Sequence, residues 1–248
     1  MGPAGVKVEQ RPAFYALRTG GWRDYVTLLH PPYTLWHLSY VVIGAALAPT
    51  LPVDRLLWGL AAFFLALGIG AHALDELNGR PLRTAIPARV LVGLATASIG
   101  GAAAIGLAAA FAWTLLLLPF VVFGTFIVVA YNLELFDGRF HSDLWFALAW
   151  GAFPVLTAYA GAAETVRPEA LLAAAFAAFL SLAQRQLSTP VRTIRRRVDR
   201  VSGAMSLNDG GEEPITRESL LHAPEAALQA LAWAIVALAL ALLVLRLG

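Results

Sequence analysis

Seven stretches of roughly 20 apolar residues, separated by shorter polar segments, make up most of the chain. A run of about 20 apolar residues is the length that an α-helix needs to cross a hydrocarbon core of about 30 Å. The pattern therefore predicts an all-α integral membrane protein, a bundle of about seven transmembrane helices. The predicted spans are residues 33–52, 55–77, 88–111, 113–132, 143–162, 168–189 and 225–246.

The third and fourth spans follow one another almost without a polar residue. A single helix over both would measure about 68 Å at 1.5 Å per residue, about twice the thickness of a bilayer. We therefore expect a tight hairpin at Phe111 to Trp113. Composition agrees with the membrane class, because 59% of the 248 residues are hydrophobic, only 14% are charged and the mean hydropathy is +0.69. The absence of cysteine excludes disulfides, thiolate metal sites and thiol catalysis.

Polar segments divide the chain further. Residues 1–30 are polar with scattered aromatic side chains, which predicts a cytoplasmic or interfacial segment before a helical membrane domain at 31–248. Inside that domain, residues 190–222 carry many charges and turn-forming residues, which predicts a cytoplasmic loop.

The basic residues give an orientation. Of the 18 Lys and Arg, all but Arg55, Arg167 and Arg246 lie before the first span, between the second span and the start of the third, after the fourth, or at the end of the sixth span and in the loop that follows it. Cytoplasmic segments of membrane proteins carry the excess of Lys and Arg. The distribution predicts a multi-pass protein of the cytoplasmic membrane with its N-terminus in the cytoplasm and its C-terminus outside.

Ionisable and amide side chains gather near the same ends of the spans. His72, Asp75 and Glu76 have the spacing that places three residues on one face of a helix. Asn132 and Arg185 lie near the corresponding ends of the fourth and sixth spans. Ionisable groups at membrane depth are costly and often functional, so we expect a cavity open to the cytoplasmic leaflet with an apolar interior for a lipid tail. The alternatives are a helix end that reaches the head groups, and cytoplasmic loops that simply carry more charge.

Five short motifs occur in an order that resembles the UbiA-type intramembrane prenyltransferases. The similarity extends over residues 30–190. The motifs are His30-Pro31-Pro32-Tyr33-Thr34-Leu35, Asp75-Glu76, Gly79-Arg80-Pro81-Leu82, Tyr131-Asn132 and Gly151-Ala152-Phe153-Pro154-Val155-Leu156-Thr157-Ala158-Tyr159.

The resemblance implies a fold, a reaction and a site. Proteins of that family hold an isoprenoid diphosphate through magnesium ions at aspartate-rich motifs and transfer the isoprenoid to a lipophilic acceptor. By resemblance, Asp75 and Glu76 are the expected catalytic carboxylates and magnesium ligands. The expected substrate-binding residues are His72, Asn78, Arg80, Tyr131, Asn132, Arg185 and Arg192.

The chain departs from the family at both motifs. Of three aspartates in the first motif, Asp75 alone is present, with Glu76 beside it; the second motif is replaced by a basic segment that begins at Gln184 and contains no carboxylate before Asp199. Two hypotheses follow. In the first, the chain is a divergent prenyltransferase in which Arg185 and Arg192 replace the second metal. In the second, it is a non-catalytic protein that binds an isoprenoid or lipid, or a subunit of a membrane assembly.

Other partners are limited by the sequence. We interpret the run Arg195-Arg196-Arg197 as a juxtamembrane patch on anionic lipid head groups. No glycine-rich phosphate loop of the required spacing occurs, which argues against a nucleotide site. The expected partners are therefore an isoprenoid diphosphate, a lipophilic acceptor and membrane lipid, and no nucleic acid.

Overall fold

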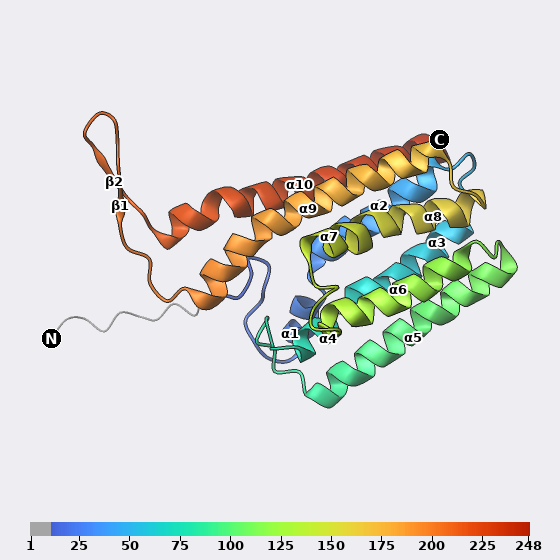
Figure 1. The fold of residues 1–248 in the computed structure, drawn as a ribbon, viewed down its shortest axis with the longest axis horizontal. Coiled ribbons are helices and arrows are strands. Elements are labelled where there is room, and N and C mark those ends of the chain that lie inside the picture. The colour runs from blue at the N-terminus through green and yellow to red at the C-terminus, as the bar shows by residue number, and fades with distance from the viewer. Residues whose placement is uncertain (1–10) are drawn as a thin grey trace.

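The computed structural model describes residues 11–248, so the first third of the predicted N-terminal segment lies outside the described residues. The chain is mostly helical, at 72%, and its long helices run roughly side by side (Figure 1). In chain order, the helices begin with α1 (Trp22–Leu28), α2 (Pro31–Leu47), α3 (Val53–Phe63), η1 (Phe64–Ala71), α4 (His72–Leu77) and α5 (Ala88–Ala112). The later helices are α6 (Leu117–Asn132), α7 (Asp143–Phe146), η2 (Ala147–Ala152), α8 (Phe153–Ala163), α9 (Pro168–Arg197) and α10 (Arg217–Leu247).

Within the described residues, five helical stretches are long and apolar enough to cross a membrane. They are Val53–Leu77, Ala88–Ala112, Asp143–Ala163, Pro168–Arg197 and Arg217–Leu247. Helix α6 is apolar but shorter, and α2 has 17 residues. The outer faces agree with a lipid environment, because large apolar side chains such as Phe111, Phe179 and Val244 are more than two thirds exposed. The chain is therefore an all-α membrane protein.

Helix α2 is the centre of the bundle and packs against both α8 and α10. It approaches α8 closely at Gly44, where an added Cβ atom would lie 2.3 Å from the carbonyl oxygen of Val155. Gly151 allows a similar approach between η2 and α9, because an added Cβ atom there would lie 2.5 Å from the carbonyl oxygen of Ala177. Small residues allow membrane helices to pack closely where no hydrophobic effect drives them together.

Two of the long helices contain a π-helical segment, η1 within Val53–Leu77 and η2 within Asp143–Ala163. Wider winding of this kind disturbs the regular backbone hydrogen bonding and occurs often at functional sites. Here a histidine ring from another turn or helix reaches a carbonyl oxygen in each segment. His72 Nδ1 lies 3.1 Å from the oxygen of Gly68, and His37 Nδ1 lies 2.9 Å from the oxygen of Trp150.

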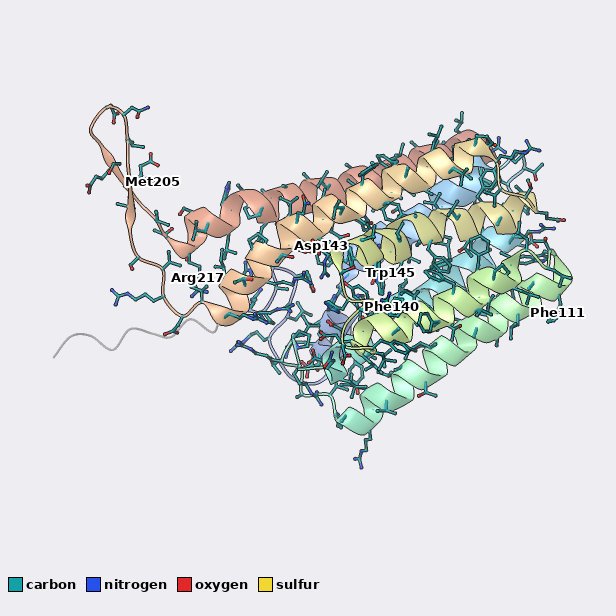
Figure 2. All side chains as sticks on the ribbon, in the orientation of Figure 1. Phe111, Phe140, Asp143, Trp145, Met205 and Arg217 are labelled. Carbon is teal, nitrogen blue, oxygen red and sulfur yellow. The ribbon has the colours of Figure 1, made fainter. Side chains whose placement is uncertain are left out.

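The segment predicted as a loop at 190–222 is shorter in the structure, because both flanking helices extend into it. Helix α9 continues through Pro190 to Arg197, and α10 begins at Arg217. Two short antiparallel strands lie between them, β1 (Ala204–Ser206) and β2 (Glu212–Pro214). This hairpin projects away from the bundle, with Met205 labelled on it and Phe111 at the opposite end of the molecule (Figure 2).

The described part of the N-terminal segment packs onto the bundle instead of lying apart from it. Asp24 of α1 is 3% exposed, and its carboxylate accepts hydrogen bonds from the backbone N–H groups of Gly20 and Ala85, both at 2.9 Å. Thr27 Oγ1 accepts a hydrogen bond from the N–H of Leu17 at 3.0 Å. These contacts fix residues 11–30 against the segment that joins α4 to α5.

Candidate functional site

A polar cavity of about 420 Å³ lies at the arginine-rich end of the bundle. It is enclosed by the N-terminal segment around Tyr15, the start of α2, the α4 turn, the end of α6, η2 and the last turns of α9. Below we call this space the polar cavity. It brings together side chains that are more than 100 residues apart in the sequence, which is what a binding site between helices requires.

One face of α9 forms the basic wall of the polar cavity. Gln184, Ser188, Arg192 and Arg196 recur at intervals of four residues, so they lie on one face of the helix, and all four line the cavity. Arg195 does not line the cavity and instead holds Glu225 of α10 with two hydrogen bonds at 2.5 and 2.8 Å. The run at 195–197 is therefore not a uniform lipid-facing patch as interpreted from the sequence, because Arg196 and Arg197 line the cavity.

The arginines of this wall differ in their partners. Arg185 is already bonded, through Nε to Asp143 Oδ1 and through Nη1 to the hydroxyl of Tyr131, both at 2.5 Å. Arg192 bonds the hydroxyl of Thr189 at 3.3 Å, and Arg196 bonds the carbonyl of Pro12 at 3.4 Å. Within residues 11–248, neither Arg192 nor Arg196 forms an ion pair with a carboxylate. Arg197 also lacks such a partner but is exposed, so Arg192 and Arg196 are the half-buried free cations of the cavity.

Aromatic side chains form the inner end of the polar cavity. The rings of Phe146 and Trp150 are stacked at 5.8 Å, and Tyr131 lies 4.4 Å from Trp150 and 4.5 Å from His141. The guanidinium of Arg185 lies over the ring of Phe146 at 5.4 Å. This cation–π contact adds to the ion pair with Asp143 in holding Arg185 in place.

Two histidines form a stacked pair on the wall opposite α9. The ring of His30, the residue before α2, lies 3.9 Å from the ring of His72. Burial lowers the pKa of His30 well below its ordinary value, and the neighbouring His72 lowers it further. His30 is therefore neutral at pH 7, and one of its ring nitrogens is a donor while the other is an acceptor.

The two predicted carboxylates have different positions. Asp75 lines the polar cavity, and no hydrogen bond to its carboxylate occurs within the described residues. Glu76 does not line the cavity and is fully buried. Its oxygens accept hydrogen bonds from the N–H of Leu82 at 2.9 Å, the N–H of Thr84 at 2.8 Å and the hydroxyl of Thr84 at 2.9 Å. Glu76 therefore fastens the α4–α5 connection.

Two further predicted residues belong to the same connection and not to the cavity lining. Asn78 donates to the carbonyl of Asn132 at 3.2 Å, and Arg80 donates to the carbonyls of Thr84 and Ile86 at 3.2 and 2.6 Å. Six predicted residues do line the polar cavity. They are His72, Asp75, Tyr131, Asn132, Arg185 and Arg192.

The cavity offers a magnesium ion fewer carboxylates than the sequence predicted. Magnesium is usually bound by one or two carboxylates together with substrate phosphates and water. Because the oxygens of Glu76 bond the connection, the expected Asp75 and Glu76 pair does not face the cavity together. Among residues 11–248, no group of three or more His, Asp or Glu side chains is close enough to hold a metal ion. Of the expected pair, Asp75 alone lines the cavity.

An apolar groove lies beside the inner end of the polar cavity. Trp150 lines both spaces. The groove has a volume of about 90 Å³ and lies between η1, α5, α6 and α8. A second pocket of about 70 Å³ shares Phe63 and Val121 with it and reaches Arg55 and Trp113 at the other end of the bundle. Below, the apolar groove means both pockets together.

Several residues of the site were missed by the sequence interpretation. Arg196 lay within a run of arginines whose facing is fixed only by the packing of α9. His30 and Tyr33 lie in the first motif of the resemblance, which was the one available signal for them. Tyr15 carried no signal, because nothing in the sequence brings residue 15 beside α9.

Comparison with known proteins adds no relative. No model of a protein family matches the chain, no curated protein is similar to it, and no solved structure matches it. The relation to UbiA-type prenyltransferases is thus a resemblance of short motifs, and the function is argued from the site.

Proposed function

We propose that the protein binds an isoprenoid diphosphate, with the diphosphate in the polar cavity and the isoprenoid chain in the apolar groove. One observation carries the proposal. Arg192 and Arg196 line the cavity without a carboxylate partner in the described part of the chain. Buried or half-buried charges are normally paired, so the cavity suits an anion.

The charge balance supports an anionic head group. Four arginines line the polar cavity, Arg185, Arg192, Arg196 and Arg197, against the carboxylates of Asp75 and Glu134. Guanidinium groups bind phosphate oxygens through charge-assisted and often bidentate hydrogen bonds. A diphosphate offers oxygens to more than one arginine at the same time, which a single carboxylate does not.

The neighbouring groove supports a hydrocarbon chain on the same ligand. Along η2 and α8, the groove extends from Trp150 to Gly161, about 17 Å at 1.5 Å per residue. Its walls are mainly apolar, and alanine is the most frequent residue in them. An amphipathic ligand would thus place its charge among the arginines and its chain inside the bundle.

Transfer of the isoprenoid to a lipophilic acceptor is a second candidate function, and Asp75 favours it. In such a step the carbon–oxygen bond to the diphosphate breaks, and its electron pair leaves with the diphosphate. A new bond then forms between the isoprenoid carbon and the acceptor, and the acceptor's proton passes to a base. Asp75 lines the cavity and has no hydrogen-bond partner in the described residues, whereas Glu134, the other carboxylate of the cavity, lies 3.7 Å from His141 Nδ1. Asp75 is therefore available as that base.

Thermal unfolding of the purified protein tests binding. At a hundredfold excess over its dissociation constant, a ligand stabilises the folded state by about 2.7 kcal/mol. We expect farnesyl diphosphate to raise the melting temperature in the presence of a chelator, and farnesol to raise it much less. Equal shifts for both compounds would contradict a diphosphate site, and a shift that needs added magnesium would restore the metal-dependent interpretation.

We also propose the seven-span arrangement with a cytoplasmic N-terminus. The arginines at the cavity end of the bundle support a cytoplasmic location of that end, and the position of α10 supports a C-terminus at the other end. Arg246 near the C-terminus donates to the carbonyls of Ala48 and Pro49, in the connection after α2. The hairpin and the C-terminus lie at opposite ends of α10 (Figure 1).

Cysteine labelling tests this orientation. The chain has no cysteine, so Ser206→Cys and Gly248→Cys each introduce a single reactive thiol. We expect an impermeant maleimide to label Gly248→Cys in intact cells and Ser206→Cys only after the membrane is opened. Labelling of both from one side would contradict the seven-span arrangement.

A further inference from the structure

Two buried side-chain atoms on the walls of the polar cavity have no hydrogen-bond partner in the described residues. They are Oε1 of Gln184 and Nε2 of His30, and among the described residues no other buried side-chain nitrogen or oxygen is left unpaired. Gln184 is only 4% exposed. An unpaired buried polar group costs about 1 to 3 kcal/mol, so a ligand that pairs with it gains that free energy back.

The proposed diphosphate does not satisfy Gln184. The amide oxygen of glutamine is an acceptor only, and the oxygens of an ionised diphosphate are acceptors as well. Nearby hydroxyl groups are already engaged, since Ser181 Oγ bonds the Tyr40 hydroxyl at 3.1 Å and Ser188 Oγ donates to the carbonyl of Arg185 at 3.2 Å. The missing partner must therefore bring an N–H or O–H of its own.

The position of Gln184 separates this partner from the diphosphate. Gln184 and Arg192 lie on the same face of α9, eight residues apart, which is about 12 Å along the helix axis. Gln184 is thus on the inner side of the free arginines, toward the end of the cavity formed by Phe146 and Trp150. An isoprenoid chain that passes this level is a hydrocarbon and offers no donor.

We propose that the polar cavity binds a second, uncharged ligand that carries a hydroxyl group, and that Gln184 accepts a hydrogen bond from this hydroxyl. The inference rests on the proposed function, because it places the second ligand beside a bound isoprenoid diphosphate. Aromatic rings at the inner end suit an apolar body for this ligand. The neutral ring of His30 on the opposite wall offers a further polar contact.

Matched alcohol and ether probes test the proposal. 1-Octanol and 1-methoxyoctane have similar chains, but only the alcohol has an O–H to donate. The purified protein is first saturated with farnesyl thiodiphosphate. Binding of each probe is then measured from the shift that it causes in the melting temperature. We expect the alcohol to bind about tenfold more tightly than the ether, since one decade corresponds to about 1.4 kcal/mol and a hydrogen bond contributes about that amount.

The variant Gln184→Met keeps the size of the side chain and removes the acceptor. It should reduce the preference for the alcohol to less than twofold. Because it also removes an unpaired buried atom, it should melt at the same temperature as the unaltered protein or higher when no ligand is present. Binding of farnesyl diphosphate alone is measured for the same variant, so failure of this inference is distinguishable from failure of the diphosphate site.

Two outcomes would overturn the inference. If the unaltered protein does not distinguish the alcohol from the ether, Gln184 is paired by water alone. If Gln184→Met retains the full preference, the hydroxyl is bound elsewhere. Gln184→Leu provides the same comparison with a branched side chain in case the methionine variant is poorly folded.

Discussion

Replacing Arg192 or Arg196 with glutamine should lower the affinity for farnesyl diphosphate by about tenfold to a hundredfold. Each charge-assisted contact to phosphate contributes about 1.5 to 3 kcal/mol, and about 1.4 kcal/mol corresponds to one decade in affinity. Both side chains line the polar cavity and lack a carboxylate partner within residues 11–248. The double variant should bind no better than farnesol does, as measured by calorimetry or thermal unfolding.

The control for this prediction is Arg200→Gln. Arg200 is exposed and does not line the polar cavity, so the variant removes the same charge from the same end of the protein. It should change affinity by less than twofold at physiological salt, where exposed charges are screened beyond about 8 Å. Equal losses for all three variants would mean that the effect is one of overall charge, and unchanged affinity in Arg192→Gln and Arg196→Gln would contradict the diphosphate site.

Arg185→Gln is expected to differ in kind from these variants. Arg185 contacts Asp143 and Tyr131 and lies over Phe146, so its loss removes contacts between α6, α7 and α9. Part of any loss in ligand affinity would then come from a changed cavity wall. For this reason Arg192 and Arg196 are the sharper test, although the sequence pointed to Arg185 and Arg192.

Replacing Glu76 with alanine should lower the free energy of unfolding by at least about 3 kcal/mol. The carboxylate is fully buried and accepts three hydrogen bonds from Leu82 and Thr84. Alanine leaves those donors without a partner, and each unpaired buried donor costs about 1 to 3 kcal/mol. Glu76→Gln keeps one acceptor oxygen and should show a smaller loss of stability. Both are measured by thermal or denaturant unfolding in detergent.

Glu213→Ala is the matched control, because Glu213 is exposed on β2 and accepts no hydrogen bond from another described side chain. Its stability should stay within about 0.5 kcal/mol of the unaltered protein. The opposite result for Glu76, an unchanged stability together with a loss of magnesium-dependent diphosphate binding, would support the metal role that the resemblance implied.

The sequence by itself determined the helices. The predicted spans 88–111 and 143–162 correspond closely to Ala88–Ala112 and Asp143–Ala163. The reason is local, because a continuous apolar run must bury its backbone polar groups in helical hydrogen bonds wherever it meets lipid. The break between the third and fourth spans follows equally from length alone, and α5 ends at Ala112. The number of spans stays a prediction, since α2 and α6 are short.

The start of the predicted loop at residue 190 was wrong for a physical reason. Proline removes one backbone hydrogen bond and crowds the preceding turn, but it ends a helix only when the remaining contacts do not support it. Beyond Pro190, Val191 is buried beside Leu221 and Leu228 of α10, and Arg195 is held by Glu225. These contacts belong to α10, so the sequence around Pro190 contains no sign of them.

Only the tertiary structure decided the site. Polar residues near the ends of the spans were visible in the sequence. The position of a residue along a helix shows which face of the helix it occupies, but not which other element packs against that face. Glu76 and Asp75 are adjacent, yet one fastens the α4–α5 connection and the other lines the polar cavity. Arg195 and Arg196 are adjacent as well, yet Arg195 bonds Glu225 and Arg196 lines the cavity. The side that each residue takes depends on which helix packs beside it, and that is fixed by close approaches such as Gly44 against Val155.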